Sequence, residues 1–260
     1  MLLTIDIGNT NITMGVFRGE ELVATWRLAT DTHKLPDEYA LLIRSLLPLK
    51  DVSPQDIDSI ALCSVVPPLT QVFDDLGSVY FGVSPLVIGT GIRTKVRILY
   101  ENPRDVGADR VVDAVAAFTL YGGPVIVVDF GTATVFDAVS RDGDYLGGAI
   151  ASGIYLTAEA LYERTSQLRR VELIPPKSAI GRNTSASIQS GILFGHVGMV
   201  EGMVHRFKAE IGEDSKVVAT GGMAPLIQKE TSIFDAVNLD LTLIGLRLIY
   251  DINADTKNVQ

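Results

Sequence analysis

The chain has 260 residues, of which 47% are hydrophobic and 20% are charged, and this balance is typical of folded globular proteins rather than disordered ones. Its formal net charge of −9 argues against a protein that coats nucleic acid, which would present a basic face. No apolar run approaches the ~18–20 residues of a membrane helix, and no basic leader precedes the first strand pattern. The single cysteine, Cys63, cannot form an internal disulfide, so we expect a core thiol and a cytoplasmic protein.

The first half of the chain predicts three strands joined by turns, followed by alternating helices and strands. A long irregular stretch then runs from Gly89 to Gly107 and leads into an apolar helix opened by Asp109 and Arg110. The predicted strands are Leu2–Ile7, Ile12–Phe17, Glu21–Leu28, Ser59–Ser64 and Pro85–Ile88, with one helix near Pro36 and another opened by Pro67 and Pro68.

The second half repeats this plan. The predicted strands are Val125–Asp129, Thr134–Ser140, Asp144–Ala151 and Lys216–Thr220. Three helices are predicted: one that begins near Gly153, one from Ser185 to Ile211 and one from Asp240 to Ile249. The polar tail from Ala254 to Gln260 is expected to fray. The pattern predicts an α/β protein with mixed sheets, divided into halves at 1–117 and 118–260, with a last helix able to pack back on the first half.

Two segments of the chain match each other at a constant offset. Asp6 aligns with Asp129 and Gly8 with Gly131, 123 residues further on, and the register continues through the third predicted strand of each half. One Asp-x-Gly sequence after a strand is an ordinary turn. Two copies within a repeated three-strand frame favour a duplicated domain that closes on one nucleotide.

Glycine in these turns permits close approach of the backbone to a phosphate. Side chains of Asn9, Thr10, Thr132 and Thr134 would add hydrogen-bond donors. A carboxylate beside a phosphate requires a cation between them, so the residues alone suggest magnesium at both Asp6 and Asp129. The chain contains neither a Walker A sequence nor a Gly-x-Gly-x-x-Gly fingerprint.

Three further features carry alternative interpretations. Gly221 and Gly222 follow a buried strand, and they either pack against an adenosine or form a plain turn. Asp109 is either a helix-terminal acid or a general base that accepts a proton from an attacking alcohol, with Arg110 binding an anionic group of that acceptor. Thr184 either caps the long helix or binds a ligand at its N-terminus. The histidines at 33, 196 and 205 are interpreted as structural, without a metal.

At these residues the chain resembles the type III pantothenate kinase family, within the acetate kinase, sugar kinase, Hsp70 and actin superfamily. The resemblance implies two duplicated ribonuclease H-like (actin-like ATPase) domains, each with a mixed five-stranded sheet flanked by helices. The segments that carry it are Asp6–Thr10, Tyr100–Pro103, Gly107–Arg110, Asp129–Thr134 and Gly181–Thr184.

The resemblance implies ATP-dependent phosphorylation of pantothenate to 4'-phosphopantothenate, the first step of coenzyme A biosynthesis, with Asp109 as the base. It implies that Asp129 holds a monovalent cation, K⁺ or NH₄⁺, instead of magnesium, while Mg²⁺ accompanies ATP and is held by Asp6 through water. It also implies a homodimer, for which the long helix from Ser185 is the candidate interface. The implied pantothenate ligands are Tyr100, Gly107, Ala108, Asp109, Arg110 and Thr184, and the ATP ligands are Asp6, Ile7, Gly8, Asn9, Thr10, Asn11, Ile12, Thr13 and Thr132.

Two positions depart from the family pattern, with Val135 where Thr is common and Asp113 where Asn is common. Asp113 adds negative charge one helical turn from Asp109 and is expected to raise the pKa of the base slightly. Two other functions stay open: a non-catalytic transcriptional accessory regulator of the same fold, and a kinase of the same superfamily for another small alcohol or carboxylate. The acidic composition and the intact Asp109–Arg110 pair argue against the regulator.

Overall fold

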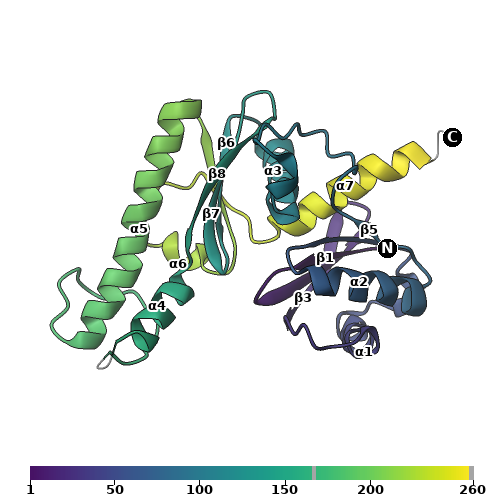
Figure 1. Cartoon of the computed structure of the whole chain (residues 1–260), viewed down its shortest axis with the longest axis horizontal. Helices are drawn as coiled ribbons and strands as arrows, with labels where there is room; N and C mark the ends of the chain where they lie inside the picture. Colours follow the sequence, from purple (N-terminus) through teal and green to yellow (C-terminus); the bar gives the residue numbers. More distant parts are fainter. Residues whose placement is uncertain (166–167, 258–260) are drawn as a thin grey trace. The chain divides into compact units, whose positions relative to one another are not determined.

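The computed structural model describes residues 1–165 and 168–257 (Figure 1). Over this part of the chain the strands form two five-stranded mixed sheets, with strand orders β3-β2-β1-β4-β5 and β8-β7-β6-β9-β10. The strands are β1 (Leu2–Ile7), β2 (Asn11–Arg18), β3 (Glu21–Ala29), β4 (Ser59–Ser64), β5 (Leu86–Val87), β6 (Val125–Phe130), β7 (Ala133–Val139), β8 (Tyr145–Ser152), β9 (Lys216–Thr220) and β10 (Ala236–Val237). The predicted fold class is therefore confirmed.

Helices cover these sheets and connect their parallel strands. They are α1 (Pro36–Leu46), α2 (Pro67–Leu76), α3 (Ala108–Tyr121), α4 (Ile154–Glu163), α5 (Thr184–Ile211), α6 (Ala224–Ile227) and α7 (Leu241–Lys257). Short 3-10 turns occur at Leu47–Lys50, Pro54–Asp56 and Pro103–Asp105, and a π turn at Gly77–Phe81.

Most predicted elements are confirmed with ends shifted by one or two residues, but the last helix is longer than predicted. It continues past Ile249 to Lys257, because Arg247 pairs with Asp251 at 2.9 Å and Asn253 donates to the Ile249 carbonyl. The expected fraying is therefore wrong for 254–257, and 258–260 lie outside the described residues. The sequence analysis also missed α6 and β10, which are too short to show a period.

The two sheets repeat one topology. β1 is antiparallel to β2 and parallel to β4, and in the same way β6 is antiparallel to β7 and parallel to β9. The aligned carboxylates occupy matching places near the ends of the central strands, where Asp6 pairs with Cys63 and Asp129 pairs with Thr220. The 123-residue repeat in the sequence therefore corresponds to a repeated fold.

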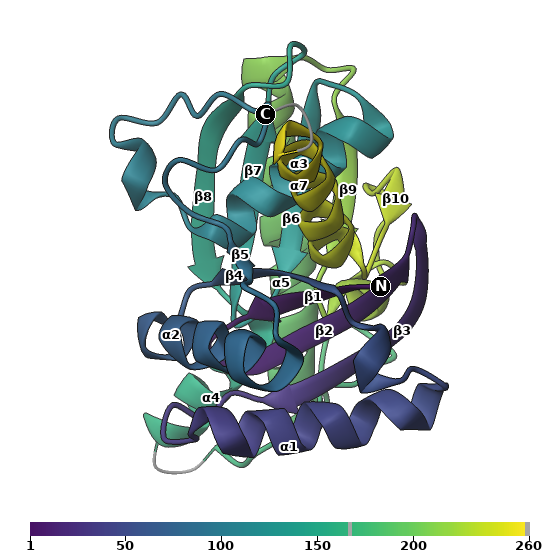
Figure 2. The ribbon, with the colours of Figure 1, turned by 90° about the vertical axis from the view of Figure 1, so that its right-hand side faces the viewer.

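Residues 1–97, 101–116 and the C-terminal helix from 240 form one compact unit. Side chains of β1 alternate between the two faces of its sheet. Leu3, Ile5 and Ile7 pack with α1 and α2 (Figure 2), whereas Leu2 packs on the other face with α7 and the start of α3. Asp6 has the same parity as Leu2, so its carboxylate points to the face that α3 covers.

Residues 98–100 and 117–239 form the second compact unit. Its main core joins alternate residues of β6, Ile126, Val128 and Phe130, to the buried stripe of α5 and to α6. Figure 1 shows α4 beside the lower part of the long α5 helix. Asp129 alternates with these residues along β6, so its side chain points to the other face of the sheet. The predicted boundary at 117 and 118 stays a prediction of domain organisation.

We predict that Gly245→Ala destabilises the first unit. A Cβ at Gly245 of α7 would overlap the carbonyl oxygen of Val112 in α3, so the two helices could not keep their close approach. The expected loss is about 1–3 kcal/mol in the free energy of unfolding, measured with urea. The control Gly89→Ala places its Cβ in open space and should change stability by less than about 0.5 kcal/mol. Equal stabilities of the two variants would contradict this packing.

Candidate active site

Asp6 lies near the C-terminal end of β1, next to Cys63 of β4. The Sγ–H of Cys63 donates to Asp6 Oδ1 at 3.4 Å, because residue pairs in register on parallel strands point to the same face. Burial and the nearby charge of Asp109 raise the pKa of Asp6 from 3.8 to about 7. Cys63 is buried, as predicted, but its contact with Asp6 was not predicted, since the pairing of β1 with β4 is tertiary.

Asp109 stands in the first turn of α3 and is half-buried. Its Oδ1 accepts the backbone N–H of Arg110 at 2.8 Å, and burial raises the pKa of this carboxyl above its ordinary value. A Cβ at Gly107 would lie 2.5 Å from the same Oδ1, so glycine leaves the room that the carboxylate occupies. The first unit therefore brings together two carboxylates from distant parts of the sequence.

The first predicted phosphate loop joins β1 to β2. The Gly8 N–H donates to the Asn11 carbonyl at 3.0 Å, which closes the turn and leaves Asn9, Thr10 and Asn11 exposed. Ile7 and Ile12 are fully buried and pair with each other across the strands. Those two can therefore contribute only backbone groups to a ligand, and Thr13, opposite Asp6, is half-buried.

The second predicted loop joins β6 to β7 and contains Gly131 and the exposed Thr132. A Cβ at Gly131 would lie 3.4 Å from Asp129 Oδ2. Gly221 has φ of +85° after β9, and a Cβ there would overlap Asp129 Oδ1. Gly221 is therefore needed both for its backbone conformation and for space beside the carboxylate. Gly222, the other predicted contact, is exposed.

Thr134 does not act as the exposed donor that the sequence analysis expected. It is fully buried, and its Oγ1 lies 2.8 Å from His196 Nε2 of α5. Burial lowers the pKa of His196, so the ring is neutral near pH 7. The structural role of this histidine stays a prediction, and the Thr134 hydroxyl contacts the long helix instead of facing solvent.

The predicted acceptor residues are distributed over both units. Ala108 and the buried Arg110 lie with Asp109 in the first unit. Tyr100 belongs to the second, where its ring lies 6.4 Å from that of Tyr145. Thr184 is the exposed first residue of α5, also in the second unit, and the cap is Asn183, whose Oδ1 accepts the Ala186 N–H at 2.9 Å. The alternative that Thr184 caps the helix is therefore wrong.

Comparison with known proteins decides the family. A family model described as type III pantothenate kinase matches residues 2–206. The chain belongs to the type III pantothenate kinase family. A type III pantothenate kinase of Moorella thermoacetica is 52% identical over 97% of this chain and 100% of its own length, and one of Dehalococcoides mccartyi strain CBDB1 is 50% identical over 97% and 96%.

Solved structures show the fold more widely. A Campylobacter jejuni protein assigned to the Baf family of transcriptional activators is 19% identical, with a TM-score of 0.62 over 97% of this chain and 99% of its own. A Sinorhizobium meliloti protein assigned as a 2-dehydro-3-deoxygalactonokinase is 10% identical, with a TM-score of 0.62 over 97% and 96%. At these identities the likeness establishes the fold only.

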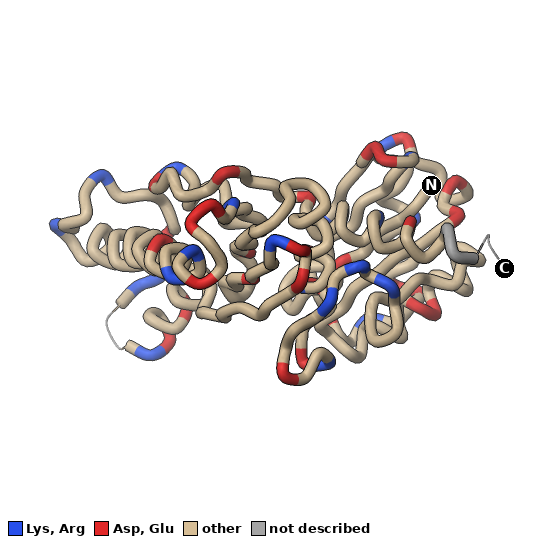
Figure 3. Tube along the Cα trace, turned by 90° about the horizontal axis from the view of Figure 1, so that it is seen from above, with Lys and Arg blue, Asp and Glu red and all other residues tan. Residues whose placement is uncertain are grey.

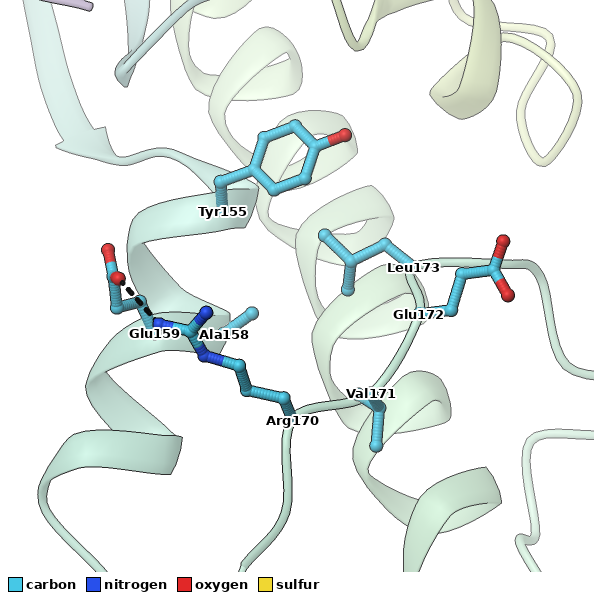
Figure 4. Close-up of a pocket in the computed structure, with 7 residues that line it drawn as sticks. All are labelled: Tyr155, Ala158, Glu159, Arg170, Val171, Glu172 and Leu173. Atoms are coloured by element: carbon cyan, nitrogen blue, oxygen red, sulfur yellow. Dashed lines mark hydrogen bonds and ion pairs between the residues drawn. The ribbon is translucent and has the colours of Figure 1, made fainter.

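Two cavities open on the second unit of this kinase, and neither is lined by the predicted site residues. One, of about 440 Å³, lies between α4 and the segment that precedes α5, where Arg170 pairs with Glu159 at 3.5 Å (Figure 4). The other, of about 450 Å³, lies between α4 and α5 and reaches His196. The prediction of the two phosphate loops therefore rests on their carboxylates and glycines, not on either of these cavities.

No group of three or more His, Cys, Asp or Glu side chains is placed to hold a metal within residues 1–165 and 168–257. The donor chemistry nevertheless fits cations that keep water and phosphate ligands, because Asp6 has a second carboxylate nearby and Asp129 lies against two glycines. Basic and acidic residues are interspersed along the described chain (Figure 3). No described helix is long and apolar enough to cross a membrane.

We predict that Asp6 makes the unliganded kinase less stable as the pH rises. The raised pKa means that the folded state keeps a proton which the unfolded state has lost, so this contribution is present below pH 3.8 and is lost as the pH rises through about 7. The full loss is at most about 4 kcal/mol. Between pH 4 and 8, the free energy of unfolding of Asp6→Asn should therefore fall less than that of the wild type.

The measurement is urea unfolding with EDTA and without nucleotide. The control Asp142→Asn, at an exposed turn, should follow the wild type at every pH. An Asp6→Asn difference that stays constant across this range would contradict the perturbed carboxyl.

Proposed function

We propose that the protein transfers the γ-phosphoryl group of ATP to the primary alcohol of pantothenate, giving 4'-phosphopantothenate and ADP in the first step of coenzyme A biosynthesis. The observation that supports this proposal is that two carboxylates lie near each other in one unit. They are Asp109, at the start of a helix, and Asp6, at the end of a strand. Family membership supports the same substrates.

Asp109 is the proposed general base. Its raised pKa improves its capacity to take the hydroxyl proton, and Gly107 leaves space for its carboxylate. As the proton moves to Asp109, the alcohol oxygen bonds to the γ-phosphorus and the bond between this phosphorus and the bridging oxygen breaks. The leaving group is ADP.

The first loop is the proposed phosphate-binding segment, with residues 6–13 and Thr132 of the second loop as ATP ligands. Exposed Asn9, Thr10 and Asn11 offer backbone and side-chain donors. Asp6 would hold Mg²⁺ through water, and this ion supplies neutralisation of the phosphate charge. Gly221 and Gly222 are the proposed adenosine contacts.

Asp129 is the proposed ligand of the monovalent cation, K⁺ or NH₄⁺. The glycines at 131 and 221 leave the room that the carboxylate occupies, because a Cβ at Gly221 would overlap Asp129 Oδ1 and one at Gly131 would lie 3.4 Å from Oδ2. A single carboxylate suits an ion of low charge better than a divalent ion, which collects more oxygen ligands.

Arg110 is the proposed partner of the pantothenate carboxylate, since guanidinium binds carboxylates in two parallel hydrogen bonds. Gly107, Ala108, Tyr100 and Thr184 complete the proposed acceptor contacts. Thr184 is free of the capping role, which Asn183 performs, so its hydroxyl can serve a ligand at the start of α5.

The protein is also proposed to act as a cytoplasmic homodimer. An interface along α5 is supported by glycines at 191, 195 and 198, where an added Cβ would meet open space and a second helix could approach closely. The buried free thiol of Cys63 agrees with a reducing compartment.

Asp109→Asn is expected to lower turnover about 10²–10⁴-fold while leaving the thermal midpoint within a few degrees of wild type, because the amide cannot accept the proton. ADP release coupled to pantothenate measures the turnover. Glu101→Gln, at an exposed position of the same segment, is the matched control and should stay near wild type. Turnover of Asp109→Asn within a few-fold of wild type would contradict its role as the base.

A panel of acceptors separates the kinase from its alternatives. Saturable ADP release with pantothenate, and none with sugars or acetate, is the expected result. Release with another acceptor alone would indicate a different kinase of the superfamily, and silence with every acceptor would favour the regulator.

A further inference from the structure

We propose that Thr30 and Gly153, which directly follow the third strand of each unit, are positioning residues that hold the two phosphate loops in their ligand-binding conformation. This inference rests on the proposed function, because it assumes that these loops bind the phosphates of ATP. Neither residue belongs to the predicted site.

Thr30 binds the first loop at two points. Its backbone N–H donates to the Thr10 carbonyl at 3.0 Å, and its Oγ1–H donates to the Gly8 carbonyl at 2.6 Å. These bonds span the exposed part of the loop and add to the backbone bond from Gly8 to Asn11. The loop therefore takes its shape in part from the end of β3.

The residue after Thr30 fixes this contact to the core. The Asp31 N–H donates to the hydroxyl of Tyr39 at 3.0 Å, and that hydroxyl donates to the Asp31 carbonyl at 3.0 Å. Tyr39 of α1 is fully buried and packs against Phe73. The residue next to Thr30 is thus hydrogen-bonded to a buried core side chain.

Gly153 occupies the same place in the second unit. Its N–H donates to the Thr132 carbonyl at 3.1 Å, and a Cβ on it would overlap that oxygen and lie 2.7 Å from the Gly131 oxygen. Its φ is −71°, which any residue can adopt, so the glycine is required for space and not for conformation. The Thr157 N–H and hydroxyl donate to the Gly153 carbonyl at 2.9 and 3.0 Å and fix it to α4.

Thr30 and Gly153 are separated by 123 residues, the offset that also relates Asp6 to Asp129 and Gly8 to Gly131. The contacts lie at corresponding places in the two units but are not identical. Thr30 donates to the Gly8 and Thr10 carbonyls, whereas the Gly153 N–H donates to the Thr132 carbonyl and the Gly131 oxygen lies close to the bare Gly153 backbone. In each unit, therefore, the residue after the third strand holds a carbonyl of the proposed phosphate loop.

The contact orients the groups that a phosphate would meet. In a trans peptide the C=O and the next N–H point in opposite directions. Holding the Gly8 carbonyl toward Thr30 turns the Asn9 N–H away from β3. Holding the Thr132 carbonyl toward Gly153 likewise turns the Ala133 N–H away from Gly153. Outward N–H groups are the donors that phosphate-binding turns use.

The test compares Thr30→Val with Thr30→Ser in the full-length protein. Valine keeps the shape and loses the donor, whereas serine keeps the donor. We expect Thr30→Val to raise the KM for ATP three- to tenfold. The KM for pantothenate should change less than twofold, and the thermal midpoint should change by only a few degrees. Thr30→Ser should stay within twofold of wild type. Thr25→Val, at an exposed position of β3, is the matched control and should leave both KM values unchanged.

Gly153→Ala tests the second loop and should also raise the KM for ATP at least threefold. The same substitution at Gly89, where an added Cβ would meet open space, is its control and should leave the KM for ATP unchanged. The inference is overturned if Thr30→Val and Gly153→Ala keep the wild-type KM for ATP, or if Thr30→Ser is impaired as strongly as Thr30→Val.

The binding of Mg·ATP, measured directly by isothermal titration calorimetry, separates this inference from the proposed function. If the wild type binds Mg·ATP without phosphorylating pantothenate, and Thr30→Val binds it three- to tenfold more weakly, the function is wrong and the inference stands. If the wild type phosphorylates pantothenate and Thr30→Val binds Mg·ATP equally well, the inference alone fails. A wild type that binds no Mg·ATP overturns both.

Discussion

The structure depends on a carboxylate placed at the end of a buried central strand, beside a glycine turn. Burying an ionised carboxylate without an opposite charge nearby destabilises the folded state. For Asp6 this shows as a pKa raised to about 7 by burial and by the charge of Asp109. A cation with its phosphate ligand would remove that cost. At the proposed site, ligand binding would therefore relieve this electrostatic cost, and the unliganded fold is less stable for keeping Asp6 buried.

Duplication has allowed the same geometry to diverge. Asp6 faces a thiol and a second acid, whereas Asp129 pairs with Thr220 and lies against glycines at 131 and 221. The first environment concentrates negative charge and fits the proposed magnesium and base. The second has one carboxylate packed against glycines and fits the proposed monovalent cation. The two loops share a backbone and differ in what surrounds their acids.

The fold itself does not select the reaction. Proteins with other assigned roles share it at 10–19% identity, so the activity depends on the few residues grafted onto it. In this chain the proposed residues include Gly107–Arg110, where a glycine leaves room for the Asp109 carboxylate and the adjacent arginine is buried. Family membership and this local geometry support the same kinase reaction independently.

The sequence by itself determined the periodic elements and the repeat. Strands such as Leu2–Ile7 and Ser59–Ser64 were predicted to the residue, because alternation and turn residues are local signals, and the 123-residue offset identified both loops. Only the tertiary structure placed Cys63 against Asp6, directed Thr134 to His196, and set Thr30 and Gly153 on the loop carbonyls. These contacts join residues distant in the chain, and their existence depends on strand pairing and helix packing that no local pattern encodes.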